Sequence, residues 1–199
     1  MQLIGRAFGV LQFRPPHWKG SPIDIALPRT EISTGIGHRD FDVSFDHTLP
    51  IETDLGRRDF TINAMAIDLG EGRMIDPFGG RQDLDQHVLR QVSPQAFPED
   101  PLRMLRGIQL AARFELTIEP ATQQAMTTHA PTIVTIAPER IAEELSKLLQ
   151  ASSPAARFAM MQSTGLLAHI LPELDALARS GKSFTQTMRR LDALQQRSE

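Results

Sequence analysis

Residues 57–64 read RRDFTINA, and residues 99–106 read EDPLRMLR. The second block marks the start of a helix, because Asp100 is a good N-cap and Pro101 suits the first helical position. The residues that follow are rich in Leu, Met, Ala and Arg, all of which favour helix. The sequence therefore predicts a long helix over residues 100–114.

Asp100, Arg103 and Arg106 recur at a spacing of three, which places them along one helical face near its N-terminal end. A carboxylate acceptor beside a guanidinium donor complements adenine and cytosine, which present an amino donor next to a ring-nitrogen acceptor. Uracil and guanine present the reverse order, so such a pair could select A and C. The alternative is that Asp100 only caps the helix while the arginines form surface ion pairs.

The composition is that of a folded globular protein, with 199 residues, 41% hydrophobic and 23% charged. The absence of cysteine excludes disulfides and thiolate metal sites and fits a reducing cytoplasm. No apolar run approaches about 18 residues and no charged-then-apolar leader is present, so we expect neither a membrane span nor a secretion signal. Because the net charge is −3, any contact with nucleic acid must rely on local clusters such as the arginines of the middle of the chain.

The chain changes character near Asp76, from a mixed α/β pattern to a helical one. Before this point we expect a β-like run over residues 1–13, a short strand over 21–29 and a long loop or hairpin edge over 31–50. After it, Pro, Gly and capping residues predict helices over residues 83–89, 100–114, 120–129, 138–151, from 154 onward to Gly165, 166–178 and 183–197.

Three acidic residues of the first part are candidates for metal or catalytic chemistry. Asp24 lies between two β-branched residues on the short strand, so it is either on the solvent face or functional. Asp40 and Asp42 flank Phe41, and alternation along a strand would put both carboxylates on one face, as a two-metal site requires. A solvated loop is the alternative, because their spacing matches no ligand set.

Several blocks, taken in order, resemble the class II tRNA nucleotidyltransferase and bacterial poly(A) polymerase family, whose members include the CCA-adding enzymes. The resemblance runs from about Gly5 to Leu174 and is carried by GRAFGV (5–10), PRTE (28–31), GIGHRDF (35–41), RRDFTINA (57–64), DPFGG (76–80), EDPLR (99–103) and PER (138–140). It implies an α+β fold, with part of a polymerase-β-like nucleotidyltransferase head over residues 1–75 and an all-α neck and RNA-binding region over 76–199.

The same resemblance implies roles for individual residues. Asp100 and Arg103 read the base of incoming ATP or CTP, Arg58 and Arg106 contact the nucleotide, and Asp59 and Asn63 shape the pocket between head and neck. Asp24 stands where the family often has a third acidic residue. Asp40 and Asp42, in contrast, match the family's Gly-His-Arg-Asp-Phe region and are not expected to replace its metal-binding carboxylates. Gln109 departs from the family, which often has another arginine there, and should weaken phosphate or base contact.

The largest departure concerns the metal site. Family members carry a Gly-Gly-x-x-Arg-Asp turn followed by an Asp-x-Asp strand that binds two Mg²⁺ ions. The 199 residues contain no such turn, and the Asp40-Phe41-Asp42 triplet matches a different family block. Mg²⁺ is expected for the complete enzyme, but no complete metal site is expected in this chain. We therefore expect the chain to be inactive alone, with the metal segment supplied from upstream or by a second chain.

The leading hypothesis is that the chain is part of a template-independent RNA nucleotidyltransferase, acting on a tRNA or another RNA 3′ end in the cytoplasm, away from membranes. The alternative is a non-catalytic nucleotide- or RNA-binding module derived from that family. The sequence leaves open whether CCA, CC, A or poly(A) is added, and it does not fix the oligomeric state.

Overall fold

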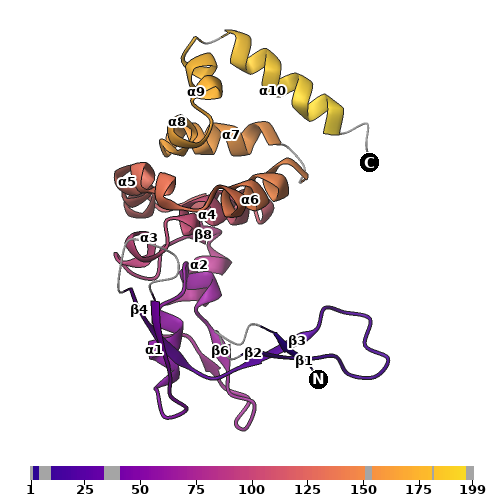
Figure 1. The fold of residues 1–199 in the computed structure, drawn as a ribbon, viewed down its shortest axis with the longest axis vertical. Helices are drawn as coiled ribbons and strands as arrows, with labels where there is room; N and C mark the ends of the chain where they lie inside the picture. Colours follow the sequence, from indigo (N-terminus) through magenta and orange to yellow (C-terminus); the bar gives the residue numbers. More distant parts are fainter. Residues whose placement is uncertain (1, 5–9, 34–40, 151–153, 181, 196–199) are drawn as a thin grey trace. The chain divides into compact units, whose positions relative to one another are not determined.

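The computed structural model describes residues 2–4, 10–33, 41–150, 154–180 and 182–195. The chain divides into two compact units, Met1–Arg57 and Arg58–Glu199 (Figure 1). Among the described residues, no helix combines the length and apolar character needed to cross a bilayer.

The first unit consists of short antiparallel strands and one helix. Strands β1 (Gln2–Ile4), β2 (Val10–Phe13) and β3 (Ile23–Ala26) form one sheet in that order, and β4 (Arg29–Ser33) pairs with β5 (Phe41–Phe45) in a second. Helix α1 (Ile51–Gly56) follows. The region 31–50 was predicted as a loop or hairpin edge; its antiparallel strand pair fits the second possibility, and the helix was not predicted. Asp42 lies in β5, whereas Asp40 lies outside the described residues.

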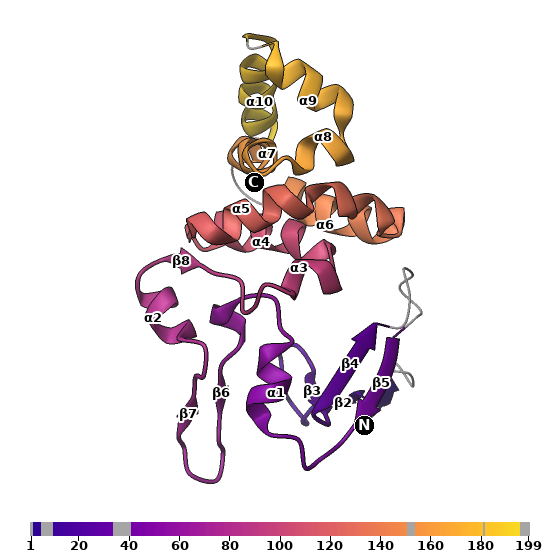
Figure 2. The same cartoon turned by 90° about the vertical axis from the view of Figure 1, so that its left-hand side faces the viewer.

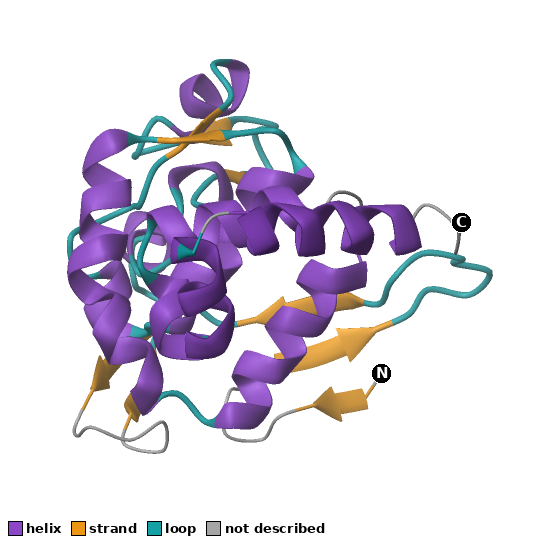
Figure 3. Cartoon of the chain, turned by 90° about the horizontal axis from the view of Figure 1, so that it is seen from above, coloured by secondary structure: helices purple, strands orange, loops and turns teal. Residues whose placement is uncertain are grey.

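The second unit begins with short elements and continues as a series of helices. The short elements are the 3-10 turn η2 (Thr61–Asn63), the antiparallel pair β6 (Ala66–Ile67) and β7 (Met74–Ile75), α2 (Gly80–Asp85), β8 (Val88–Leu89) and α3 (Ala96–Glu99). The remaining elements are α4 (Leu102–Arg113), β9 (Thr117–Ile118), α5 (Pro120–His129), η3 (Ala130–Thr135), α6 (Pro138–Gln150), α7 (Pro154–Ser163), α8 (Leu166–Ile170), α9 (Pro172–Arg179) and α10 (Lys182–Gln195). Figure 3 shows how short the strands are beside the helices. The mixed α+β fold with a helical second part is the predicted class.

Two predicted helices have different boundaries in the structure. The segment 83–89 was predicted as one helix, but α2 ends at Asp85 and Val88–Leu89 is a strand that pairs in parallel with β9. The segment 166–178 was also predicted as one helix, but it is interrupted before Pro172. Proline lacks the N–H that would continue the backbone ladder, so α9 starts anew at that residue.

Helix α4 forms the centre of the hydrophobic core of the second unit. Met104, Leu105, Ile108 and Ala111 are fully buried at the spacing of one helical face. α4 packs against α3, α6 and α7, and Figure 2 draws it beside α3 and α6. Its opposite face carries Arg103, Arg106, Gln109 and Arg113, so the core fixes the direction in which this polar row points.

Candidate functional site

The block 57–64 folds back on itself around one carboxylate. Asp59 is 5% exposed, and its Oδ1 accepts hydrogen bonds from the backbone N–H of Phe60 at 2.9 Å and from Nδ2 of Asn63 at 3.1 Å. Nη1 of Arg58 donates to the carbonyl oxygen of Asn63 at 3.0 Å, although its side chain is exposed. The turn η2 therefore brings Arg58, Asp59 and Asn63 together.

Phe60 attaches this block to α4. Its ring is fully buried and lies against the ring of Phe97, with 6.2 Å between centroids. The ring also abuts Gly107 of α4 so closely that a Cβ at position 107 would lie 2.6 Å from Cζ of Phe60. This approach is possible only at a glycine, and it brings the neighbouring residues Asp59 and Arg106 into contact.

Asp59 and Arg106 form an ion pair across the contact between the two blocks. Oδ2 of Asp59 lies 2.9 Å from Nη2 of Arg106, but the angles are not those of a hydrogen bond and this oxygen has no hydrogen-bond donor. The carboxylate is buried, whereas the guanidinium is 48% exposed. Arg106 is thus held at one side and presents the rest of its five N–H donors to solvent or a ligand.

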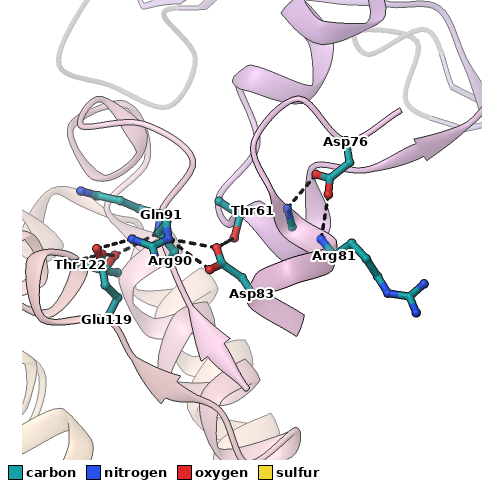
Figure 4. Close-up of polar contacts among 9 residues, drawn as sticks. Thr61, Asp76, Arg81, Asp83, Arg90, Gln91, Glu119 and Thr122 are labelled. Carbon is teal, nitrogen blue, oxygen red and sulfur yellow. Dashed lines mark hydrogen bonds and ion pairs between the residues drawn. The ribbon is translucent and has the colours of Figure 1, made fainter. Parts of the chain in front are cut away.

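A second polar cluster, comprising Thr61, Asp83, Arg90, Glu119 and Thr122, fixes the block from the other side (Figure 4). Oδ2 of the buried Asp83 accepts hydrogen bonds from Oγ1 of Thr61 at 2.7 Å and from Nε of Arg90 at 3.0 Å. Hydrogen bonding to Asp83 raises the pKa of the Arg90 guanidinium. Arg90 also pairs with Glu119, whose other oxygen caps α5 by accepting from the N–H of Thr122 at 3.1 Å.

The DPFGG segment supports Thr61 through backbone packing. Asp76 accepts hydrogen bonds from the N–H groups of Gly80 at 2.7 Å and Arg81 at 2.9 Å, so it caps α2 as Figure 4 shows. Gly79 adopts a left-handed conformation with φ 73°. A Cβ at Gly80 would lie 2.1 Å from the carbonyl oxygen of Thr61, so this position also needs a glycine.

Asp100 lies just before α4 and has two partners. Its backbone is extended, Pro101 already has helical angles, and the helix itself begins at Leu102. Oδ1 accepts a hydrogen bond from the N–H of Leu102 at 3.2 Å, so the carboxylate does cap the helix. Oδ2 accepts a hydrogen bond from Nη2 of Arg140 in α6 at 3.1 Å. An ionised carboxylate has about four acceptor positions, so capacity for a ligand donor remains.

Arg103 is held by α3. Its Nη1 donates to the carbonyl oxygen of Ala96 at 3.1 Å and to Oε2 of Glu99 at 3.2 Å. The side chain is 13% exposed. The side chains of Asp100 and Arg103 are thus held by different neighbours, and the backbone N–H of Arg103 donates to the carbonyl oxygen of Asp100 at 3.0 Å.

Asp24 belongs to the first unit. It lies exposed on β3, where its Oδ1 accepts a hydrogen bond from Nε2 of Gln12 at 3.1 Å. Within the described ranges, no three His, Asp or Glu side chains are placed to hold a metal ion together.

Four residues that shape the site had no role assigned from the sequence. Asp83, Arg90 and Arg140 contribute through partners that are distant in sequence, and Gly107 contributes through a close approach. Arg140 does belong to one of the motif blocks quoted above, PER (138–140). Gly107 could have been noticed as a glycine inside a strongly predicted helix, which usually has a packing reason.

Comparison with known proteins agrees with this architecture. Residues 5–90 match the family model described as poly A polymerase head domain, and residues 115–177 match the model described as probable RNA and SrmB-binding site of polymerase A. The multifunctional CCA protein of Xylella fastidiosa (strain M23) is 46% identical over 159 residues, which are 77% of this chain and 38% of that protein. The multifunctional CCA protein of Nitrosococcus oceani is 44% identical over 157 residues, with the same two shares.

Solved structures of CCA-adding enzymes are also similar to this chain. The Bacillus stearothermophilus CCA-adding enzyme in complex with CTP superposes with a TM-score of 0.72 at 32% identity, over 87% of this chain and 41% of that one. The Thermotoga maritima CCA-adding enzyme complexed with tRNA has a TM-score of 0.66 at 31% identity, over 84% and 37%. Fold and blocks together define a nucleotidyltransferase head followed by a helical neck. The chain belongs to the CCA-adding enzyme and poly(A) polymerase family, and it spans about 38% of the length of the curated relatives.

Proposed function

We propose that this chain forms the nucleotide-recognition part of a template-independent RNA nucleotidyltransferase that adds A or C to an RNA 3′ end. The observation that carries the proposal is the pair Asp100 and Arg103 at the beginning of α4, each held in place by a partner from another segment. Relatives whose structures contain CTP or ATP support a nucleoside triphosphate as ligand, and the relative bound to tRNA supports RNA as acceptor.

Base selection follows from hydrogen-bond complementarity. The carboxylate of Asp100 accepts from the exocyclic amino group of adenine or cytosine, while the guanidinium of Arg103 donates to the adjacent ring nitrogen. Uracil and guanine offer an acceptor to Asp100 and a donor to Arg103, so both contacts become repulsive. A good bidentate contact contributes about 1–3 kcal/mol, equivalent to roughly fivefold to 150-fold in affinity.

The remaining site residues support the nucleotide outside its base. We assign Arg58 and Arg106 to contacts with the nucleotide, because both are exposed at one side while hydrogen-bonded or ion-paired at the other. Asp59 and Asn63 hold these two cations in position. We place the head at residues 1–75 and the neck with its RNA-binding region at 76–199. Mg²⁺ would activate the attacking 3′-hydroxyl and stabilise the leaving pyrophosphate in the complete cytoplasmic enzyme.

The test is equilibrium binding of the four nucleoside triphosphates to the 199-residue chain. We expect ATP and CTP to bind about tenfold more tightly than UTP and GTP, and Asp100→Ala to abolish this preference. Asp100→Asn retains an oxygen for the helix cap and serves as a second variant if the alanine variant unfolds. Asp85→Ala, which removes an exposed i,i+4 ion pair in α2, is the matched control. An unchanged base preference in both Asp100 variants would refute the assignment.

A further inference from the structure

The loop of residues 14–22 joins β2 to β3 and extends beyond these strands in Figure 1. It carries Trp18, the single tryptophan of the chain, with 49% of the residue exposed. Scattered exposed apolar side chains are common on protein surfaces. Trp18 differs from them in how its ring is held and in the charges that surround it in the sequence.

The indole of Trp18 is fixed by its own loop. Its Nε1 donates a hydrogen bond to the carbonyl oxygen of Ser21 at 2.7 Å, and its backbone N–H donates to the carbonyl oxygen of Pro15 at 3.2 Å. A Cβ at Gly20 would lie 2.9 Å from Cε2 and Nε1 of the indole, so this edge of the ring packs on the glycine backbone. A ring that is already fixed loses little conformational entropy when a flat ligand stacks on its exposed surface.

The 14–22 loop is also positively charged. Arg14, His17 and Lys19 are exposed, and no acidic residue occurs in the chain before Asp24, although the whole chain has a net charge of −3. In the part of the chain that the structure describes, neither Arg14 nor Lys19 forms an ion pair with a carboxylate. Both cations are therefore available to an anionic partner without the loss of an existing ion pair.

A partner that suits this loop has a flat group for the indole and negative charges for the two cations. Single-stranded nucleic acid has both, because every base has a face that can stack and every nucleotide carries a phosphate. In a double helix, by contrast, the faces of the bases are already stacked on one another.

We propose that the 14–22 loop binds one unpaired nucleotide of the RNA substrate, whose base stacks on Trp18 while the neighbouring phosphates lie against Arg14 and Lys19. The choice of RNA rather than DNA rests on the proposed function. Stacking accepts any base, so this contact adds affinity for a single strand and leaves base selection to Asp100 and Arg103.

Trp18 reports on its own environment, since the chain has no tyrosine and no second tryptophan. We expect single-stranded hexaadenylate to quench the fluorescence of the full 199-residue chain, because a stacked base contacts the indole directly. A blunt-ended RNA duplex should leave the emission unchanged. The affinity for fluorescein-labelled hexaadenylate, measured by anisotropy, should fall at least about fivefold in Trp18→Leu, whereas Trp18→Phe keeps a ring and should retain part of it.

The two cations are tested by the salt dependence of the same binding. Arg14→Gln and Lys19→Gln should each weaken binding and reduce the slope of log affinity against log salt concentration by about 0.7. Arg81→Gln removes the same charge from an exposed arginine of α2 that already pairs with Asp85. This control should leave both the affinity and the slope unchanged.

The proposal is overturned if hexaadenylate leaves the emission unchanged, or if Trp18→Leu binds it as tightly as the unaltered chain does. A blue shift with vesicles of phosphatidylserine and phosphatidylcholine, without quenching by RNA, would assign the loop to a lipid surface and overturn it too. The same holds for emission that changes with protein concentration but not with RNA, which would indicate contact between copies of the chain.

Base preference among the triphosphates separates this proposal from the proposed function. If Asp100 substitutions leave that preference unchanged while hexaadenylate still quenches Trp18, the proposed function fails and the RNA contact of the loop stands. If the preference depends on Asp100 but RNA does not quench Trp18, only the loop proposal fails.

Discussion

Replacing Gly107 by alanine tests whether the close approach of Phe60 to α4 is what holds Asp59 beside Arg106. The added methyl carbon would lie 2.6 Å from Cζ of Phe60 and 2.6 Å from Cε of Met126. Both neighbours are fully buried, so neither can move into solvent. The end of Met126 can adjust by rotation, but the rigid ring of Phe60 must move as a whole.

Two opposing contributions set the size of the effect. In a helix interior that has room, Gly→Ala stabilises by about 1 kcal/mol. An extra methyl group in a filled core costs typically about 1–3 kcal/mol. With two contacts this short, we expect the unfavourable contribution to win, with a net loss near 1 kcal/mol and a melting temperature lower by roughly 2–4 °C. Displacement of Phe60 also shifts Asp59, so triphosphate binding should weaken by up to about fivefold.

The assay is a double-mutant cycle with Phe60→Leu, which removes the atom that the new methyl group meets. Chemical denaturation gives the free energy of unfolding of both single variants and the double variant. If the contact is as described, the double variant loses about 1 kcal/mol less than the sum of the single losses. The reasoning is refuted if Gly107→Ala stabilises the chain, or if the two effects simply add.

Gly80→Ala places a Cβ 2.1 Å from the backbone oxygen of Thr61, and no side-chain rotation relieves this clash. We expect the free energy of unfolding, measured with denaturant, to fall by about 2–3 kcal/mol. A smaller loss than that of Gly107→Ala would contradict this expectation. Asp83→Asn removes the charge of the buried carboxylate that accepts a hydrogen bond from Thr61, and should lower the free energy of unfolding by about 1–3 kcal/mol. An unchanged midpoint of thermal unfolding would show that this hydrogen bond contributes nothing to stability. In the first unit, the pKa of Asp46 is lowered by the hydrogen bond from the side chain of Thr48 and then by that from its backbone N–H. The ionised Asp46 therefore stabilises the folded state at pH values above its ordinary pKa, and this stabilisation is lost as the pH falls through the lowered pKa of the folded state. Thr48→Ala should move the Asp46 titration, followed by NMR, upward toward the ordinary value; an unmoved titration would refute the cause.

Helices whose limits depend on local chemistry could be predicted from the sequence. Pro120, Pro138 and Pro154 each start a helix at the predicted position, because a proline suits the first turn whatever lies elsewhere in the chain. The strand Val88–Leu89 could not be predicted in this way. This strand forms because it pairs in parallel with Thr117–Ile118, and local sequence propensity does not reveal a partner so far along the chain.

The candidate site likewise has features that could be predicted from local sequence and others that depend on distant partners. The spacing of Arg103 and Arg106 was enough to place both on the face of α4 opposite its buried residues, because helical periodicity is local. Their partners were not foreseeable, since Asp59 and Glu99 could equally have faced solvent. The pairing of Asp100 with Arg140 joins residues 40 positions apart, and it depends on how α6 packs against α4.

The rotation of α4 about its axis connects core packing with nucleotide recognition. Each residue along an α-helix turns it by about 100°, so a slip of one residue would turn Arg103 and Arg106 away from Glu99 and Asp59 together. The chain fixes this rotation by burying Met104, Leu105 and Ile108 and by seating Gly107 against Phe60. Substitutions at the Gly107 contact should therefore alter base preference as well as stability, although none of the atoms involved would touch a nucleotide.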